Sequence, residues 1–315
     1  MQKIIPHLWY DKEAKEAAEF YVSAFSALGL PDTHIQNINT IHNTPSGDCD
    51  TVSFELGGQH FMAISAGPYF TFNPSVSFML NFDPSKDPKA TEHLDQLWEQ
   101  LSQGGKVLME LQEYPFSKRY GWLEDKYGLS WQLILTNPTG EPRPFIVPSL
   151  LFVTDTCDKA EEATDFYISV FKNAPSASGG QAARGVLARY PAGMEPNKEG
   201  AVMFTDFQLF GQWFAAMDGS SRMHHFKFNE AVSFMVKCDT QEEIDYYWGK
   251  LSAVPESEQC GWLKDKYGFS WQIVPTAMDE MMNTKDQVRL DRVTQAFLKM
   301  KKFDITELQK AAEGK

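Results

Sequence analysis

The segment GWLEDKYGLSWQLILT at residues 121–136 returns as GWLKDKYGFSWQIVPT at residues 261–276, and eleven of the sixteen positions are identical. The blocks FYVSAF and VSFMLNFD of the first half return in the same order as FYISVF and VSFMVKCD in the second half. Chance does not produce three ordered matches of this quality, so the sequence contains a tandem duplication. The offset (261 − 121 = 140 residues) is far longer than a solenoid repeat, and each copy is therefore expected to be a domain.

The repeat divides the chain of 315 residues into four parts. We expect a first domain at residues 1–136, a linker at 137–144, a second domain at 145–276 and a helical extension at 277–315. The linker NPTGEPRP is rich in proline and glycine, which favour turns over helices and strands. Two domains also agree with the length of the chain, because domains usually hold about 100–200 residues.

Hydrophobic periodicity predicts an α+β fold in both copies. In the first copy, a short apolar strand is followed by apolar residues at helical spacing from Ala14 to Leu28. Val52, Phe54 and Leu56 then alternate with polar residues, as in a half-buried strand. The order of one strand, one helix and three strands occurs twice in each copy. The second copy lacks an obvious counterpart to KVLMELQEYPF, so we expect its sheet to be one strand shorter there.

Composition and charge exclude several classes of partner. The chain has 29 basic and 42 acidic residues and a formal net charge of −13, which is unfavourable for binding nucleic acid. No apolar run approaches the ~18–20 residues that span a membrane. The first twenty residues carry charges from Asp11 onward, so we expect no export signal. Four cysteines without CxxC spacing are typical of free thiols, and we expect a cytoplasmic protein.

Two βαβββ modules per copy resemble the vicinal-oxygen-chelate superfamily, the fold of glyoxalase I, bleomycin-resistance proteins and extradiol dioxygenases. The blocks FYVSAF, GGQHFMAISAGPYFTFNPSVSFML and GWLEDKYGLSWQLI are similar to those of its PhnB-like family, whose members often carry the label 3-demethylubiquinone 3-methyltransferase. The second copy is similar again, from FGQWFAAMDG to QCGWLKDKYGFSWQIVP. The resemblance implies tandem glyoxalase-like domains, in which pairs of modules curl their mixed sheets into half-open cups. No glycine-rich loop follows a strand and opens a helix, and we expect no cofactor.

In the metal-using relatives, inward-facing His and Glu lie on the opening, fourth, fifth and last strands of the cup. The resemblance matches these positions in the two copies, in that order, to His7 and Ser149, Ala63 and Ala216, Ser77 and Ser233, and Gln132 and Gln272. Transition metals prefer imidazole, carboxylate or thiolate ligands, which methyl, hydroxyl and amide groups do not replace. We therefore expect no metal site, whether the modules pair within a copy or across the copies.

Aromatic and basic residues complete the predicted pockets. Indole rings suit a flat or apolar ligand, and they also suit a packed core. They are grouped by copy as Trp9, Trp122 and Trp131 in one cup and Trp213, Trp262 and Trp271 in the other. Of the neighbours Trp131 and Gln132, the resemblance places Gln132 in the cup. Strand alternation from Ala63 predicts that His60 faces away from His7. The first cup is expected to be the functional one, with His7 at depth and Lys118 and Arg119 at the rim for an anionic ligand.

The favoured hypothesis is a protein that binds a small molecule, with no catalytic residue assigned. An enzyme of unassigned reaction, of lyase, isomerase or oxygenase type, remains an alternative. A structural or regulatory subunit whose cups mediate contacts is the second alternative. The duplication itself is typical of a dimer fused into one chain, and the sequence leaves open whether two such chains form a homodimer.

Overall fold

The computed structural model describes residues 2–175, 181–282, 284 and 286–315, whose strands form two mixed sheets. The strands of the first copy are β1 (Ile4–Tyr10), β2 (His34–Thr44), β3 (Gly47–Leu56), β4 (Gln59–Ser65), β5 (Val76–Phe82), β6 (Lys106–Tyr114), β7 (Ser117–Glu124) and β8 (Ser130–Leu135). Those of the second copy are β9 (Ile146–Phe152), β10 (Ala183–Arg189), β11 (Val202–Leu209), β12 (Gln212–Asp218), β13 (Val232–Cys238), β14 (Trp262–Lys264) and β15 (Ser270–Pro275).

The helices alternate with groups of strands, which confirms the α+β class. They are α1 (Ala14–Ser26), α2 (Ala90–Ser102), α3 (Ala160–Lys172), α4 (Gln241–Leu251), α5 (Ala277–Met282), α6 (Gln287–Phe297) and α7 (Ile305–Glu313). Short 3₁₀ turns occur at Thr154–Thr156 and Pro255–Ser257. None of the helices in the described ranges is long and apolar enough to cross a membrane.

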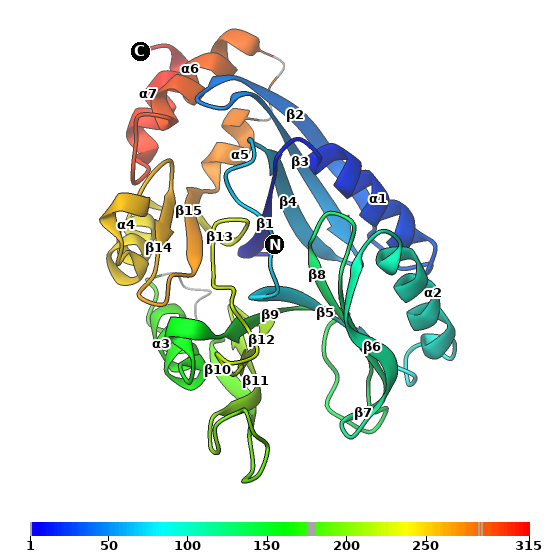
Figure 1. The fold of residues 1–315 in the computed structure, drawn as a ribbon. Coiled ribbons are helices and arrows are strands. Elements are labelled where there is room, and N and C mark those ends of the chain that lie inside the picture. The colour runs from blue at the N-terminus through cyan, green and yellow to red at the C-terminus, as the bar shows by residue number, and fades with distance from the viewer. Residues whose placement is uncertain (1, 176–180, 283, 285) are drawn as a thin grey trace.

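The two sheets combine modules of different copies. Sheet A has the order β14-β15-β13-β1-β4-β3-β2, and sheet B has the order β10-β11-β12-β9-β5-β8-β7-β6. The joints are antiparallel, with β1 beside β13 in sheet A and β5 beside β9 in sheet B. The first module therefore pairs with the fourth and the second with the third, as the colours of Figure 1 show. This answers the question of pairing that the sequence left open.

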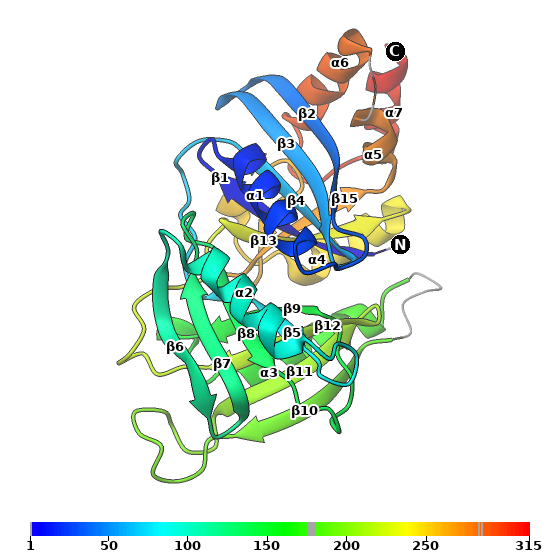
Figure 2. The same cartoon turned by 90° about the vertical axis from the view of Figure 1, so that its right-hand side faces the viewer.

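The helices and the inner faces of the sheets enclose the main core. α1 packs on β3 and against α2, while α3 packs on β11 (Figure 2). Aromatic pairs join the sheets: the Phe61 and Phe78 ring centroids are 5.1 Å apart, and those of Phe214 and Phe234 are 5.2 Å apart. The opposite faces of the sheets point away from this core. We call them the concave faces, His7 marking that of sheet A and Ser149 that of sheet B.

The duplicated block that identifies the repeat has a structural role. In the first copy the buried carboxylate of Asp125 accepts hydrogen bonds from the Tyr21 hydroxyl and the Trp131 indole, both at 2.8 Å. It also accepts from the backbone N–H groups of Tyr127 and Leu129. One side chain thus fixes the DKYG turn and ties α1 to β8, which explains the recurrence of this segment without assigning it any chemistry.

The second copy is shorter by one strand, as its sequence predicted. β14 has three residues and lies at the edge of sheet A, and the C-terminal extension contacts the residues just before it. The carbonyls of Met300 and Lys301 accept hydrogen bonds from the N–H groups of Cys260 and Gly261 at 2.8 and 2.7 Å. The ring of Phe303 lies so close to Gly261 that a Cβ there would be 2.5 Å from it. The extension therefore covers an edge that would otherwise expose unpaired backbone groups.

Helices α5 and α6 lie in the sequence between β15 and the residues that contact Gly261. They cross the outer side of sheet A. α5 packs on β15 and α6 packs on β2, at the end of the molecule far from sheet B (Figure 1). Met278, Met281 and Val293 are buried by this packing. The two sheets consequently differ: a helical segment lies over sheet A, whereas the short linker lies beside sheet B.

Candidate functional site

Side chains from both copies meet on the concave face of sheet A. The register aligns His7 with Ser233 on β13 and with Met62 on β4. Gln272 aligns with Met235 and donates a hydrogen bond to the Ser233 hydroxyl at 2.9 Å. His7, Ser233 and Gln272 thus form a small polar patch on this face, and each is at most 5% exposed.

Sheet B repeats this arrangement at the matching positions. Ser149 aligns with Ser77 across the joint, and the Gln132 amide donates to the Ser77 hydroxyl at 2.7 Å. Here the Tyr120 hydroxyl also donates to the Gln132 carbonyl oxygen at 2.7 Å. In the second copy Cys260 occupies the place of Tyr120, so the glutamine of sheet A lacks this third partner.

Two of the expected pocket positions lie on the other face. Ala63 aligns with Leu8 and Ala216 with Leu150, and all four belong to the main core. The concave-face residues beside them are Met62 on β4 and Ala215 on β12. The expectation for this strand is corrected by one position, because successive residues of a strand point to opposite faces.

The same correction changes the position of His60. His60 is two residues from Met62 and therefore shares the concave face with His7, contrary to the sequence-based prediction. Its Nε2 lies 2.7 Å from the Ser53 hydroxyl, so the ring is already engaged there. Burial and the nearby Lys237 ammonium lower the pKa of His60, while Asp279 opposes this.

The imidazole of His7 is the distinctive polar group of sheet A. Burial lowers its pKa from 6.5 to about 3, so the ring is neutral near pH 7. Its Nδ1 atom is buried and has no hydrogen-bond partner in the described residues. In sheet B, the Ser149 hydroxyl at the equivalent position is also buried, without a hydrogen-bond partner in the part of the chain that the structure describes. Buried polar atoms are nearly always paired, so each is a place where a water or a ligand atom fits.

Aromatic rings surround His7. The Trp262 ring lies edge-on to the imidazole at 5.4 Å and 5.9 Å from Trp9. Phe70 and Tyr69, from the connection between β4 and β5, lie 5.1 and 6.4 Å from Trp9. Trp9 and Trp262 are half-buried, and Tyr69 is 65% exposed. The rings form a wall that runs from the polar patch to the surface.

The indoles are therefore grouped by sheet and not by copy. Trp9 and Trp262 share sheet A, although they belong to different copies. Trp122 and Trp213 lie on the concave face of sheet B, where Trp122 donates to the Ser130 hydroxyl. Trp131 is buried in the main core, like its counterpart Trp271.

Arg119 does not meet His7. It lies on β7 of sheet B, and its guanidinium donates to Asp95 of α2 at 2.6 Å. Tyr120, its neighbour on the strand, faces the concave side, so Arg119 lies on the helix side. One ligand therefore does not bridge His7 and Arg119, and the expected anionic rim contact has no basis in this geometry.

The linker forms polar contacts with residues of sheet B. Arg143 stacks on the Trp213 ring at 3.7 Å and donates to the carboxylate of Asp206 at 2.8 Å. Asn81 donates from β5 to the carbonyl of Pro144. These contacts hold the linker against β5, β11 and β12 and engage the polar groups there.

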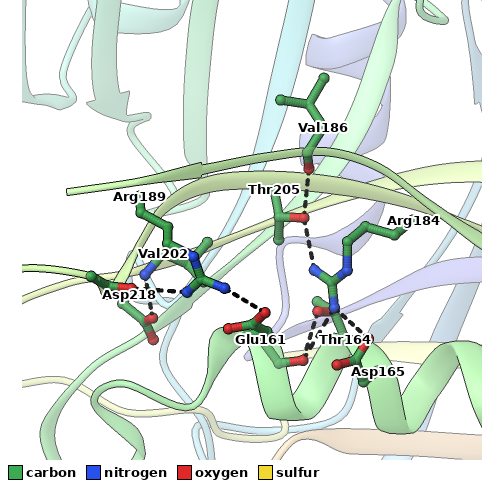
Figure 3. Close-up of polar contacts among 10 residues, drawn as sticks. Glu161, Thr164, Asp165, Arg184, Val186, Arg189, Val202, Thr205 and Asp218 are labelled. Carbon is green, nitrogen blue, oxygen red and sulfur yellow. Dashed lines mark hydrogen bonds and ion pairs between the residues drawn. The ribbon is translucent and has the colours of Figure 1, made fainter. Parts of the chain in front are cut away.

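A surface cavity of about 380 Å³ lies outside both concave faces, beside the β10–β11 connection and the end of β12. Its buried carboxylate, Asp218, accepts from the N–H groups of Ala160 and Val202 at 2.9 Å. Arg189 reaches from β10 to Glu161 on α3, and Figure 3 shows this ion pair beside the hydrogen bond from Val202 to Asp218. The carboxylate serves the fold, and we assign the cavity no chemistry.

The residues present do not fit a transition metal. His7, Ser233, Gln272 and Met62 offer one imidazole, and the hydroxyl and the amide already bond each other. The imidazole of His60, on the same face, is engaged with the Ser53 hydroxyl. Sheet B offers hydroxyls and an amide at the same places. Across the described ranges, no three His, Cys, Asp or Glu residues gather as a metal would require.

Comparison with known families gives the same result for both copies. The model of the family described as 3-demethylubiquinone-9 3-methyltransferase matches residues 2–134 and again residues 144–274. The chain belongs to this family. The double match agrees with the internal repeat and with the PhnB-like resemblance of its blocks. No curated protein matches the chain.

Solved structures of similar proteins cover one copy or both. A PhnB protein from Bacillus cereus, described as a putative 3-demethylubiquinone-9 3-methyltransferase, is 37% identical, with 43% of this chain and all of that chain covered and a TM-score of 0.37. A Pseudomonas aeruginosa protein is 20% identical over 43% of this chain and 98% of its own, with a TM-score of 0.34. Glyoxalase I from Zea mays is 11% identical over 90% of this chain and 98% of its own, with a TM-score of 0.48.

Proposed function

We propose that the protein binds a small molecule on the concave face of sheet A, through His7 and without a transition metal. The observation that carries this proposal is the buried Nδ1 atom of His7, which lacks a partner among the described residues. A ligand atom that hydrogen-bonds to this nitrogen would satisfy it. The adjacent serine and glutamine bond each other, so His7 is the open position of the patch.

The chemistry of the patch favours a neutral, flat ligand. With a pKa of about 3, His7 offers no positive charge to an anion and is a weak base near pH 7. The Trp9 and Trp262 rings provide an apolar wall beside it. A ring with a hydroxyl or a carbonyl group, as in phenols and quinones, combines both properties. The description of the family names a quinone of this kind, but methyl transfer is not part of our proposal.

The test uses phenol and 2-naphthol as probes for the full chain. Imidazole ¹⁵N signals report the hydrogen bonding of each histidine, and the His7→Phe variant identifies the signal of His7. We expect both probes to shift this signal, with the same affinity from pH 5 to pH 8 because His7 stays neutral. His7→Phe keeps a ring but removes the nitrogen, and it should weaken binding about 2–10-fold.

Ser149→Ala on sheet B is the matched control and should leave these affinities unchanged. Native mass spectrometry of protein purified without chelator supplies an independent measurement, since it shows retained metabolite or metal. Equal affinities in the wild type and His7→Phe would contradict the proposal, and so would one firmly held transition metal per chain.

A further inference from the structure

Sheet A carries a second polar position, far along the same concave face. Lys237 follows Ser233 and Met235 at intervals of two residues on β13 and therefore shares their face. The distance from Ser233 is about 13 Å, since a strand advances ~3.3 Å per residue. The Lys237 side chain is only 4% exposed. Lys237 is thus a buried cation outside the patch that contains His7.

The counter-ion of Lys237 comes from the C-terminal extension. Its ammonium group pairs with the carboxylate of Asp279 on α5, the one ion-pair partner found for it in the described ranges. The Asp279 side chain is 58% exposed. A buried charge without a partner is strongly unfavourable, so Lys237 requires an anion whenever α5 is not in place.

The helical segment over sheet A is less completely hydrogen-bonded than the segment that follows it. Arg289 Nε and Thr294 Oγ1 on α6 are buried without a partner in the described residues. Residues 300–305, in contrast, form backbone hydrogen bonds to Cys260 and Gly261 and two hydrogen bonds to the Gln241 side chain. Because unpaired buried polar atoms weaken an interface, α5 and α6 are easier to displace than the segment after them.

Sheet B does not contain this charge. The residue that matches Lys237 is Asn81, whose amide donates to the linker carbonyl of Pro144. In both sheets, the segment that follows the last strand of one copy thus contacts this equivalent position, which is Asn81 in sheet B and Lys237 in sheet A. In sheet A alone that contact is ionic, and the ion pair is therefore specific to this sheet.

We infer that Lys237 is an anion-binding subsite of sheet A, which the chain itself occupies with the carboxylate of Asp279. A small molecule with a carboxylate or phosphate group takes the place of Asp279 and detaches α5 from β13. Ligand and α5 compete for one ammonium group, so the extension regulates access to the subsite. This inference goes beyond the proposed function, because it does not involve His7.

The test measures binding of inorganic phosphate and of acetate to the full chain by calorimetry, at constant ionic strength. Asp279→Asn removes the competing carboxylate and should tighten phosphate binding about tenfold or more. Glu280→Gln makes the same charge change on an exposed residue of the same helix and should leave the affinity unchanged. Lys237→Met should abolish binding. Acetate should follow the same order if carboxylates are accepted as well as phosphates.

Hydrogen exchange gives a second readout. Phosphate should accelerate exchange of the α5 amides in the wild type and leave Lys237→Met unaffected. Equal phosphate affinities in Asp279→Asn and Glu280→Gln would overturn the inference, as would unchanged binding by Lys237→Met or no phosphate binding by any variant. Phenol binding at His7 is measured separately. Failure of the proposed anion subsite at Lys237 is therefore distinguished from failure of the proposed ligand site at His7.

Discussion

Asp265 in the second copy is a buried carboxylate whose ionisation opposes folding. It accepts hydrogen bonds from the Tyr167 hydroxyl and the Trp271 indole, at 2.7 and 2.9 Å, and from two backbone N–H groups. Burial nevertheless raises its pKa from 3.8 to about 6, because these bonds only partly replace water. The carboxyl of Asp265 therefore titrates in a range where few other carboxyl groups do.

The sign of its effect on stability follows from this shift. Between pH 4 and pH 6 the folded state holds the proton of Asp265 more firmly than the unfolded state, so stability falls as pH rises through this window. The contribution is about 3 kcal/mol, at ~1.4 kcal/mol per pKa unit. Asp265→Asn removes it, and the unfolding free energy of the wild type minus that of the variant should fall by about that amount from pH 4 to pH 7. Urea denaturation at several pH values measures this, and a constant difference would contradict it.

The family resemblance, and not strand alternation, named most residues of the candidate site. The resemblance matched His7, Ser233 and Gln272 to separate strand positions, and the sequence did not reveal that these three residues meet in one sheet. Ala63 was misplaced because a shift of one residue exchanges the faces of a strand, and short-range patterns do not set that register. Lys237 was missed, since its significance depends on a helix forty residues away.

At the scale of elements, a distant segment contacts the edge of the sheet where the second copy is one strand shorter. Gly121 and Gly261 hold equivalent places, and each leaves room for an aromatic ring from outside its strand. The ring is Trp98 of α2 in the first copy and Phe303 of the extension in the second. The missing strand was predictable from a gap in the repeat. The contact of the extension with this edge was not, because it depends on residues about forty positions apart.

Phe303→Ala should release the extension from sheet A. The ring is 3% exposed, and truncation of a buried phenylalanine typically costs about 3–5 kcal/mol. Hydrogen exchange should accelerate in α5, α6 and α7 while the strands of sheet B keep their protection. Lys299→Ala, at an exposed position of the same segment, should change little. Unchanged exchange in the extension of Phe303→Ala would show that this ring is not its anchor.

At the scale of the whole molecule, each sheet needs both copies. The joints between β1 and β13 and between β5 and β9 are continuous ladders of backbone hydrogen bonds, supported by aromatic pairs between the sheets. Residues 137–142 of the linker contribute little to this association, because they are exposed, and the linker contacts sheet B through Arg143 and Pro144. The domain boundaries predicted from the repeat therefore describe the sequence copies, while the structural units are the sheets.

Cutting the linker should leave the molecule assembled. A protease site inserted between Thr139 and Gly140, both exposed, allows cleavage of the folded chain. We expect the two fragments to elute together in size-exclusion chromatography and to appear as a one-to-one complex by native mass spectrometry, because the joints remain paired. Fragments that separate without denaturant would show that the joints are weaker than their ladders indicate.

The joint between β1 and β13 also determines how the molecule responds to dilution. A site built by two separate chains dissolves when their concentration falls below the dissociation constant, since its formation follows mass action. Here the partner of each module is tethered to it, so the site forms in a first-order process whose yield does not depend on the amount of protein present. Tethering also frees the two sites from the identity that symmetry imposes on a homodimer. His7 with Ser149 and Lys237 with Asn81 are two of the pairs in which this chain has used that freedom.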